Sequence, residues 1–423
     1  MKPLEERQEN PVEAQVTGDV IGDTAYSERF VLKILLKLAN LDLLKEEVQE
    51  KTFEDDLCTL WDMTAERDVV LFLQKHEILK LLNFALPTIE TPRIIEIVVG
   101  IIANMCCQKE AVESLLKMDS FLSFIIEYIK SDDSLVIIQL LRLVNSCLFL
   151  ASEDDVGVWT DLFIKVGYSS ALYFILKNSS NKDLLVTALE NFNTICSYCN
   201  TDKTRINFFG HFVTVEALES LTVAFSEVTI KQKELVDKNE LERVLIISLQ
   251  ITLNLVGFDK KLDISNENME DVALMVKTVL HYYERKIVNQ KEVDMDLVDI
   301  VDSTVTIVKV LEMSEISEPD KYFTPSYNMW KALNTMEDQN KNDSSKFEED
   351  DKDELQEFSC KLRKPLCTLI CLYLQKCSDE NLSYSIEQID SNLDEVLISV
   401  VEAELVTAIT DRLSYYRTRI KDC

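Results

Sequence analysis

Four asparagines occupy equivalent places in four apolar stretches of the chain. Asparagine inside a helix is less favourable than alanine by up to ~0.7 kcal/mol, and its amide needs hydrogen-bond partners when it is buried. A feature that recurs despite this cost predicts a repeated role, in which each amide either faces a partner protein or bonds a neighbouring helix. The four are Asn104 in VVGIIANMCC, Asn145 in LLRLVNSCLFLA, Asn193 in TALENFNTICSYC and Asn254 in SLQITLNLVGF.

The residues around the asparagines leave both roles open. The positions four before them share their helix face and are mostly apolar or small, namely Gly100, Leu141 and Leu189, with Gln250 as the polar exception. That pattern favours an amide bonded inside the core. The positions three before them include an arginine and a glutamate, which suit a surface that binds a partner. The candidate partner-binding residues are therefore Asn104, Asn145, Asn193, Asn254, Arg142 and Glu190.

One pair of cysteines has the spacing of metal ligands, but the sequence lacks the second pair that a zinc site needs. Cys196 and Cys199 form a CxxC pair, which is half of a typical zinc site. No second CxxC or HxxxH follows at the usual distance, and the pair lies in an apolar stretch. Cys367 and Cys371 lie one helical turn apart in a similar stretch. We expect these thiols to be core residues and the chain to bind no metal.

Catalytic motifs are missing from the sequence. The chain contains three histidines, His76, His211 and His281, and no GxSxG, HExxH, GxGxxG or GxxxxGK[ST] segment. Acid–base chemistry can run on carboxylates alone, but the adjacent acidic pairs fall in expected turns or in one acidic segment. We therefore predict no enzymatic activity and no cofactor. A site assembled only in three dimensions stays open as an alternative.

Composition indicates a nearly all-helical protein with a large core. The 423 residues include only 7 glycines and 7 prolines, whereas 47% are hydrophobic. An α/β enzyme of this length needs many more glycines for phosphate loops and tight turns. The scarcity of both helix breakers predicts an all-α fold.

Net charge restricts the classes of partner. The formal charge of -31 repels nucleic-acid phosphates and anionic membrane surfaces, and it favours basic protein partners. The first residues show no apolar signal region, and no uninterrupted apolar stretch is long enough to span a membrane. The 11 cysteines are then expected to be reduced thiols. These features predict a nuclear or cytoplasmic protein that is not secreted.

Helical periodicity divides the chain into repeats. From about residue 64 the apolar pattern predicts triplets made of a short helix and two longer ones, and the third helix carries the asparagine. A period of ~40–47 residues is typical of armadillo and HEAT repeats. We predict a right-handed helical solenoid with a flexible lead over 1–24, capping helices over 25–63, repeats over 64–336, an acidic disordered loop over 337–357 and C-terminal capping helices over 358–423.

The acidic segment 337–357 has almost no apolar residues, which predicts disorder. Ser345 is followed three residues later by Glu348, a setting that acidophilic kinases favour. Because the segment is acidic, it could also compete internally for a basic ligand.

Three blocks near the start of the chain occur in a recognisable order. They are GDVIGDTAYS over 18–27, LWDM over 60–63 with DVVLFLQ over 68–74, and PR at 92–93 followed by VGIIANM over 99–105. Together they resemble the serum-amyloid-A-like (saal) family. The resemblance implies an armadillo-like fold, a nuclear or nucleocytoplasmic location, a link to cell proliferation and no enzymatic activity. It implies no established binding residues.

The sequence departs from the armadillo pattern of nuclear-import receptors. That pattern places a tryptophan four residues before the groove asparagine, and here those positions hold Gly100, Leu141, Leu189 and Gln250. We therefore expect a protein-interaction scaffold or regulatory adaptor without enzymatic activity. The alternative is a transport adaptor or chaperone-like carrier for a basic protein cargo.

Overall fold

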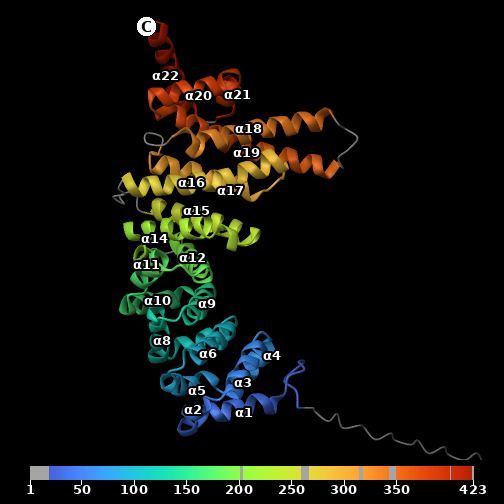
Figure 1. Cartoon of the computed structure of the whole chain (residues 1–423), viewed down its shortest axis with the longest axis vertical. Helices are drawn as coiled ribbons and strands as arrows, with labels where there is room; N and C mark the ends of the chain where they lie inside the picture. The colour runs from blue at the N-terminus through green and yellow to red at the C-terminus, as the bar shows by residue number, and fades with distance from the viewer. Residues whose placement is uncertain are drawn as a thin grey trace, which may run out of the picture. The chain divides into compact units, whose positions relative to one another are not determined.

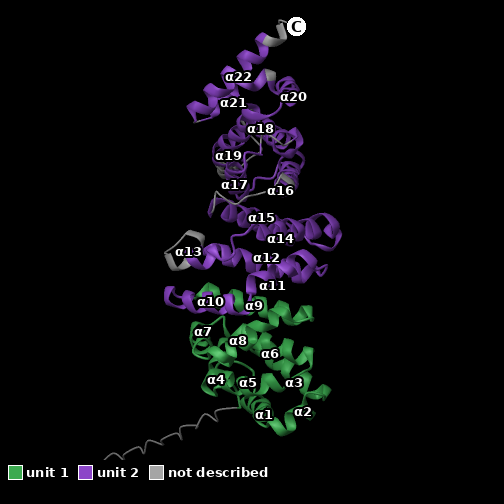
Figure 2. Cartoon of the chain, turned by 90° about the vertical axis from the view of Figure 1, so that its left-hand side faces the viewer, with its two compact units in different colours: residues 1–151 green, residues 152–423 purple. Residues whose placement is uncertain are grey.

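The chain is all-α in the part that the structure, a computed structural model, describes. That part comprises residues 19–200, 203–258, 266–313, 318–342, 349–400 and 402–421, and no strand occurs in it. Contacts divide the chain into two compact units, Met1–Ala151 and Ser152–Cys423 (Figure 2). The expectation of an all-α helical solenoid is confirmed, and the boundary between the units falls inside the predicted repeats.

Unit 1 contains three helix triplets (Figure 1). In each triplet the third helix packs on the third helix of the next, since α3 contacts α6 and α6 contacts α9. The triplets are α1 (Glu28–Ala39), α2 (Leu41–Glu47) and α3 (Lys51–Met63); α4 (Arg67–Lys75), α5 (Ile78–Ala85) and α6 (Pro92–Met105); and α7 (Lys109–Leu116), α8 (Asp119–Ile126) and α9 (Ser134–Leu150).

Local sequence explains where these helices begin. Ser27 accepts a hydrogen bond from the backbone N–H of Phe30 at the start of α1, and Asp133 does the same for Leu135 and Val136 at the start of α9. Pro92 opens α6, where its missing N–H has no consequence. Eleven residues of the 14-residue α6 are buried, as expected for a helix that lies between neighbours on both sides.

Unit 2 begins with two triplets and continues with helix pairs. The triplets are α10 (Glu153–Val166), α11 (Tyr168–Asn178) and α12 (Lys182–Cys196); and α13 (Lys203–Gly210), α14 (Val215–Ser226) and α15 (Lys238–Phe258). The pairs are α16 (Asn266–Arg285) with α17 (Asp296–Val310) and α18 (Pro319–Asn342) with α19 (Glu349–Lys376). The unit ends with α20 (Asp379–Ile389), α21 (Leu393–Ser399) and α22 (Ala403–Lys421).

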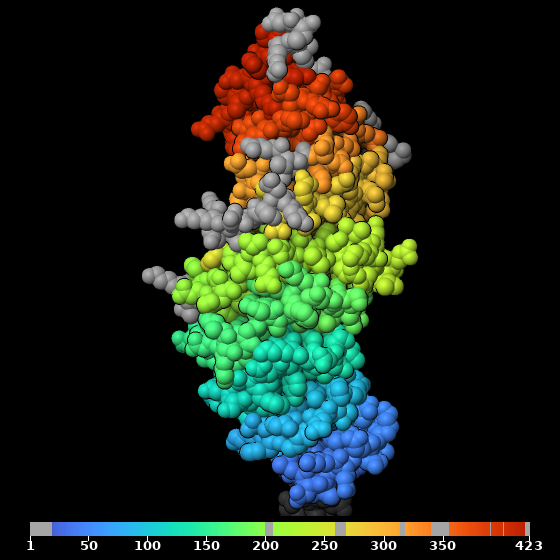
Figure 3. Space-filling view, turned by 60° about the vertical axis from the view of Figure 1, so that its left-hand side comes forward, coloured from blue at the N-terminus to red at the C-terminus, as the bar shows by residue number. Residues whose placement is uncertain are grey.

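Two rows of helices make up most of unit 2. The second-helix row consists of α11, α14, α16 and α18, and the third-helix row consists of α12, α15, α17 and α19; in both rows each helix contacts the next. Large aromatic side chains such as Trp159 and Trp330 are buried in this unit, and in the space-filling view side chains fill the space between neighbouring helices (Figure 3). Stacking therefore covers apolar faces that a single repeat would expose.

Two helices of the second-helix row end in π-helical turns. The segment η4 (Glu227–Lys231) continues α14, and η6 (Lys286–Gln290) continues α16. A short 3-10 turn, η5 (Lys233–Leu235), follows η4. Such π-turns are rare and occur often at functional sites.

Helix α15 is long and apolar enough to cross a membrane by length and composition alone. Half of its most apolar window is buried inside the protein, and it packs against α12, α14 and α17. A core helix of a folded domain has the same properties, so α15 is explained by its place in the third-helix row.

The acidic segment 337–357 is more helical than its composition predicts. Helix α18 extends to Asn342 and α19 begins at Glu349, so both ends of the segment belong to helices. Arg363 on α19 explains part of this order, because it donates to Asn334 Oδ1 at 2.7 Å and to Glu337 Oε1 at 2.8 Å on α18. Residues 343–348, including Ser345, lie outside the described residues.

The predicted flexible lead 1–24 lies mostly outside the described residues, which start at Asp19. The described end of this segment is bound to α1, since Asp19 accepts hydrogen bonds from Ser27 Oγ at 2.7 Å and from the backbone N–H of Arg29 at 3.0 Å. These bonds lower the pKa of Asp19, with the Ser27 hydroxyl as the largest cause. Asp19 thus stabilises the start of α1 by binding both the N-cap residue Ser27 and the first-turn residue Arg29.

Candidate partner-binding site

All four repeated asparagines lie on third helices, and all four are half-buried. Asn104 lies on α6, Asn145 on α9, Asn193 on α12 and Asn254 on α15. The first two helices pack against each other in unit 1, and the last two do so in unit 2. The prediction that the asparagines mark one helix of each repeat therefore agrees with their placement.

Asn104 is bonded mainly within the protein. Its Nδ2 donates to Thr64 Oγ1 at 3.1 Å and approaches the carbonyl oxygen of Trp61 at 3.4 Å, both at the end of α3. Its Oδ1 accepts from Arg142 Nη2 of α9 at 3.5 Å. The bond to Arg142 is at the long limit for an N–H···O bond, and Arg142 is exposed. A partner could therefore replace Arg142 at Oδ1 without disturbing the bonds to α3.

Trp61 fills the position where Gly100 has no side chain. A Cβ atom added to Gly100 would lie 2.4 Å from two carbons of the indole, so the ring lies directly on the backbone of α6. Gly100 is four residues before Asn104, the position of tryptophan in the import-receptor pattern. Here a tryptophan from the preceding third helix reaches the same place. Sequence reasoning missed this, although both residues belong to the blocks that carry the family resemblance.

The remaining residues of those blocks also hold unit 1 together. Gly22 has a φ of 53°, and the backbone N–H of the next residue, Asp23, donates to Asp68 Oδ2 at 2.9 Å. Arg93 pairs with the buried Glu96 at 2.8 Å and with Glu54 of α3 at 3.5 Å. The resemblance therefore rests on residues with a visible structural role in unit 1.

In unit 2 the structure gives Glu190 a partner that the sequence did not suggest. Glu190 on α12 is half-buried and pairs with Arg243 Nε of α15 at 3.1 Å. Burial raises the pKa of Glu190, whereas Arg243 opposes that shift and Glu240 adds to it. Lys182 joins the same two helices through Glu240 at 2.8 Å. Charged pairs thus connect the neighbouring third helices α12 and α15, and one of them begins one turn before Asn193.

The six candidate residues form two groups, one in each unit. The structure brings Asn104 and Arg142 together in unit 1, with Asn145 one helical turn beyond Arg142. In unit 2 it places Glu190 one turn before Asn193, on a helix packed against that of Asn254. We treat the groups as two separate candidate surfaces.

Three of the four cysteines predicted to be core residues are buried, and the side chain of the fourth, Cys199, lies outside the described residues. Cys196 is buried at the end of α12, and Cys367 and Cys371 are buried on α19. Burial raises the pKa of Cys367 to about 11 and that of Cys371 to about 12. Among the described residues, no group of three or more His, Cys, Asp or Glu side chains could hold a metal ion.

Thiol alkylation should separate these cysteines from the exposed ones. Cys107 and Cys360 are exposed, so iodoacetamide at about pH 8 should label them within minutes, because the reagent reaches an exposed thiol directly. Cys367 and Cys371 should react at least about a hundredfold more slowly, since both burial and a raised pKa suppress the thiolate. Peptide mass spectrometry against time measures this, and equal labelling of all four would contradict the buried placement.

Comparison with known proteins places the chain beside one group of vertebrate proteins. No protein-family model matches it. A segment of 188 residues is 31% identical to protein saal1 of Danio rerio, covering 42% of this chain and 39% of that protein. This part of the chain is therefore similar to the saal1 proteins. Protein SAAL1 of Mus musculus is 29% identical over 184 residues, covering 40% of this chain and 38% of that protein.

The similarity to the saal1 proteins is partial. Protein saal1 of Xenopus tropicalis is 31% identical over 185 residues, covering 41% of this chain and 40% of that protein. The chain thus spans about two fifths of the length of these relatives, between 38% and 40%. The family resemblance predicted from the three blocks is confirmed, whereas the activity and partners of the whole relatives remain matters for proposal.

Solved structures with related architecture are distant. A designed armadillo repeat protein in complex with the peptide (KR)4 is 13% identical, with a TM-score of 0.42 over 66% of this chain and 98% of that chain. An engineered protein is 12% identical, with a TM-score of 0.33 over 92% of this chain and 99% of that chain. The description of the fold therefore depends on the contacts between helices given above and not on these distant structures.

Proposed function

We propose that the chain is a non-enzymatic scaffold or regulatory adaptor that binds partner proteins along its third helices. The observation that carries this proposal is the half-buried asparagine repeated on helices that pack side by side. A half-buried amide can bond a neighbouring helix with one end and the backbone of a partner with the other. The Asn104 amide has this form, with its Nδ2 turned toward α3 and its Oδ1 toward the exposed Arg142.

Charge supports a basic partner. The net charge of -31 attracts basic segments over several ångströms and accelerates their encounter with the protein. Because salt screens this attraction, binding of such a partner should weaken as ionic strength rises. The exposed Arg142 and the Arg243–Glu190 pair add local charges of both signs, which would select among basic partners.

Affinity purification with paired variants tests the proposal. The full chain, the double variant Asn145→Ala/Asn193→Ala and the control Asn239→Ala/Asn289→Ala are compared at physiological salt. Asn239, in the first turn of α15, and Asn289, in η6, are both exposed, so the control removes two amides and leaves all four repeated asparagines in place. We expect the control to retain its protein partners. The Asn145→Ala/Asn193→Ala variant should lose some of these partners, although its melting temperature should not change.

Two results would contradict this proposal. Loss of thermal stability in Asn145→Ala/Asn193→Ala, with partners unchanged at low temperature, would assign the asparagines to the core. If no protein partner is recovered and a catalytic turnover is confirmed, the proposed scaffold function is wrong.

A carrier of basic cargo is the second candidate, and the acidic residues around the α18–α19 junction favour it. Since both ends of 337–357 are helical, deleting the segment would remove parts of two helices. Reducing its negative charge by Asp350→Asn, Asp351→Asn and Asp353→Asn keeps the chain length. A carrier with an internal competitor should then bind a basic peptide more tightly, whereas a scaffold should bind its own partner unchanged.

We also propose, from the resemblance alone, a nuclear or cytoplasmic location and a connection to cell proliferation. Imaging of the tagged full chain and growth measurements after its depletion test these two statements separately. A secreted product would contradict the first, and unchanged growth would contradict the second.

A further inference from the structure

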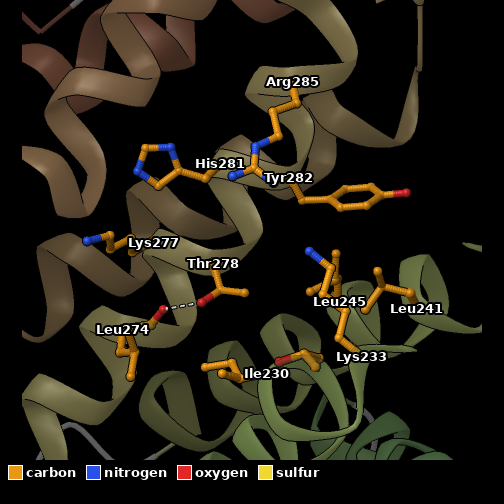
Figure 4. A pocket seen from close by; sticks show the side chains of 11 residues that line it. Ile230, Lys233, Leu241, Leu245, Leu274, Lys277, Thr278, His281, Tyr282 and Arg285 are labelled. Carbon is orange, nitrogen blue, oxygen red and sulfur yellow. Dashed lines mark hydrogen bonds between the residues drawn. The ribbon is translucent and has the colours of Figure 1, made fainter. Parts of the chain in front are cut away.

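Unit 2 contains a hollow between α14, α15 and α16 that is lined by none of the four repeated asparagines. Its volume is about 420 Å³, within the usual range of ~300–1,000 Å³ for ligand sites. Segments η4 and η5, the start of α15 and the last turns of α16 form its walls (Figure 4).

Apolar side chains form the base of the hollow and extend beyond it. Leu241 and Leu245 of α15 are buried, whereas Ile230 and Leu274 are 46% and 38% exposed. A second hollow of about 180 Å³ is also lined by Ile230 and Leu274. The two hollows therefore adjoin at Ile230 and Leu274, and we refer to them together as the groove.

Positive charge is concentrated at the larger hollow. Figure 4 shows the ammonium of Lys233 and the guanidinium of Arg285 directed toward the same space from opposite sides. Lys277 points away from this space and pairs with Asp320. None of the residues that line the larger hollow is a carboxylate, although the chain has a net charge of -31. The larger hollow is therefore suited to a negative group, whereas the smaller one is lined by both Lys231 and Asp271.

The surrounding backbone fixes the shape of the groove. One π-turn, η4, lines it through Thr229 and Ile230, and the lining residue Arg285 is followed directly by the second π-turn, η6. The Tyr282 hydroxyl donates to Glu242 Oε1 at 2.6 Å, which orients the ring at the edge of the hollow. The site is thus formed before any ligand arrives, and binding needs little ordering of the protein.

We propose that this groove binds an acidic peptide segment of a partner protein. Two apolar side chains of the peptide enter the two hollows on either side of Ile230 and Leu274, and a carboxylate lies between Lys233 and Arg285. Two adjoining hollows fit neighbouring side chains of one peptide, whereas a small anion would use only the charged end. Apolar anchors beside a charge pair are a common basis of peptide affinity. The inference does not depend on the asparagine surfaces, whose variants leave this groove intact.

A peptide-display selection tests the proposal with the full chain. Random dodecapeptides are selected on the wild type, on Lys233→Glu/Arg285→Glu and on the control Lys331→Glu, which changes an exposed charge elsewhere in unit 2. The wild type and the control should both enrich peptides with Asp or Glu beside two apolar residues. The Lys233→Glu/Arg285→Glu variant should lose this class, and titration should show affinity for the best peptide at least about tenfold weaker. Replacing Ile230 by Asp should also weaken binding.

Several outcomes would overturn the inference. The first is that the wild-type selection yields no acidic–apolar peptides, and the second is that the Lys233→Glu/Arg285→Glu variant enriches them equally. The third is that inorganic phosphate at physiological ionic strength displaces the peptide fully, which would indicate a simple anion site. Equal melting temperatures of the variants establish that they are folded. Partner loss in Asn145→Ala/Asn193→Ala reports on the third-helix surfaces separately.

Discussion

Replacing Lys286 by methionine is expected to destabilise unit 2 by about 3–5 kcal/mol, because it leaves carboxylates without their shared cation in a partly buried site. The Lys286 side chain is only 6% exposed, and its Nζ lies 2.7 Å from Asp294, 3.1 Å from Glu242 and 3.2 Å from Glu292. These partners raise the pKa of Lys286 against the opposing effect of desolvation, so the amine stays charged at neutral pH.

Lys238 provides the matched control for this prediction. It reaches Glu242 and Glu292 at 3.8 Å each but is 60% exposed, so Lys238→Met should change stability by no more than about 1 kcal/mol. Adding Glu242→Gln and Asp294→Asn to Lys286→Met should restore part of the free energy of unfolding that Lys286→Met removes. Urea unfolding, combined with hydrogen exchange of the η6 and α17 amides, measures the difference. Equal effects of Lys286→Met and Lys238→Met would show that the cluster is open to water.

The substitution Gly100→Ala is expected to destabilise unit 1 by about 1–3 kcal/mol, the usual range for an overpacked contact. At an unobstructed helical position the same change would stabilise the protein, because alanine is favoured over glycine by ~1 kcal/mol. At Gly100 the added methyl group would lie 2.4 Å from the Trp61 indole, so the ring must move off α6. That movement also displaces the Trp61 carbonyl and Thr64 from Asn104.

Gly157 and Trp61 supply the controls. No atom lies within 4 Å of a Cβ built on Gly157 in α10, so Gly157→Ala should stabilise unit 2 by about 0.4–1 kcal/mol. In a double-mutant cycle, Trp61→Ala should relieve the effect of Gly100→Ala, giving a coupling energy of about 1 kcal/mol or more. Thermal unfolding of the four proteins measures it. If Gly100→Ala and Gly157→Ala stabilise equally, the close packing of Trp61 on α6 is wrong.

The helices and their order could be predicted from the sequence because the signals are local. The apolar face of α6, Pro92 at its start and the Ser27 cap of α1 are all readable within a few residues. The repeated asparagines also marked the third helices correctly. Helical order at the ends of 337–357 was missed because part of it comes from Arg363, which bonds residues more than 25 positions earlier.

The sites were harder to predict because they are assembled from distant segments. The contact between Trp61 and Gly100 depends on how α3 and α6 stack, and no pattern within either helix reveals it. The groove in unit 2 combines η4, η5, α15 and α16, and its shape depends on π-turns that have no sequence signature. In the sequence this region shows only a charged stretch around 229–242, a composition that is typical of a solvated insertion.

The polar contacts along the second-helix row of unit 2 have a consequence for cooperativity. Lys177 joins α11 to α14 through Glu219, Lys321 joins α18 to α16 through Glu270, and Asn328 joins the same two helices through Glu284. These bonds connect adjacent repeats. In such an arrangement each repeat is stabilised mainly by its contacts with the neighbouring repeats. A mechanical force applied at one end should therefore open this row one repeat after another, and the repeats farthest from that end would keep their binding surfaces longest.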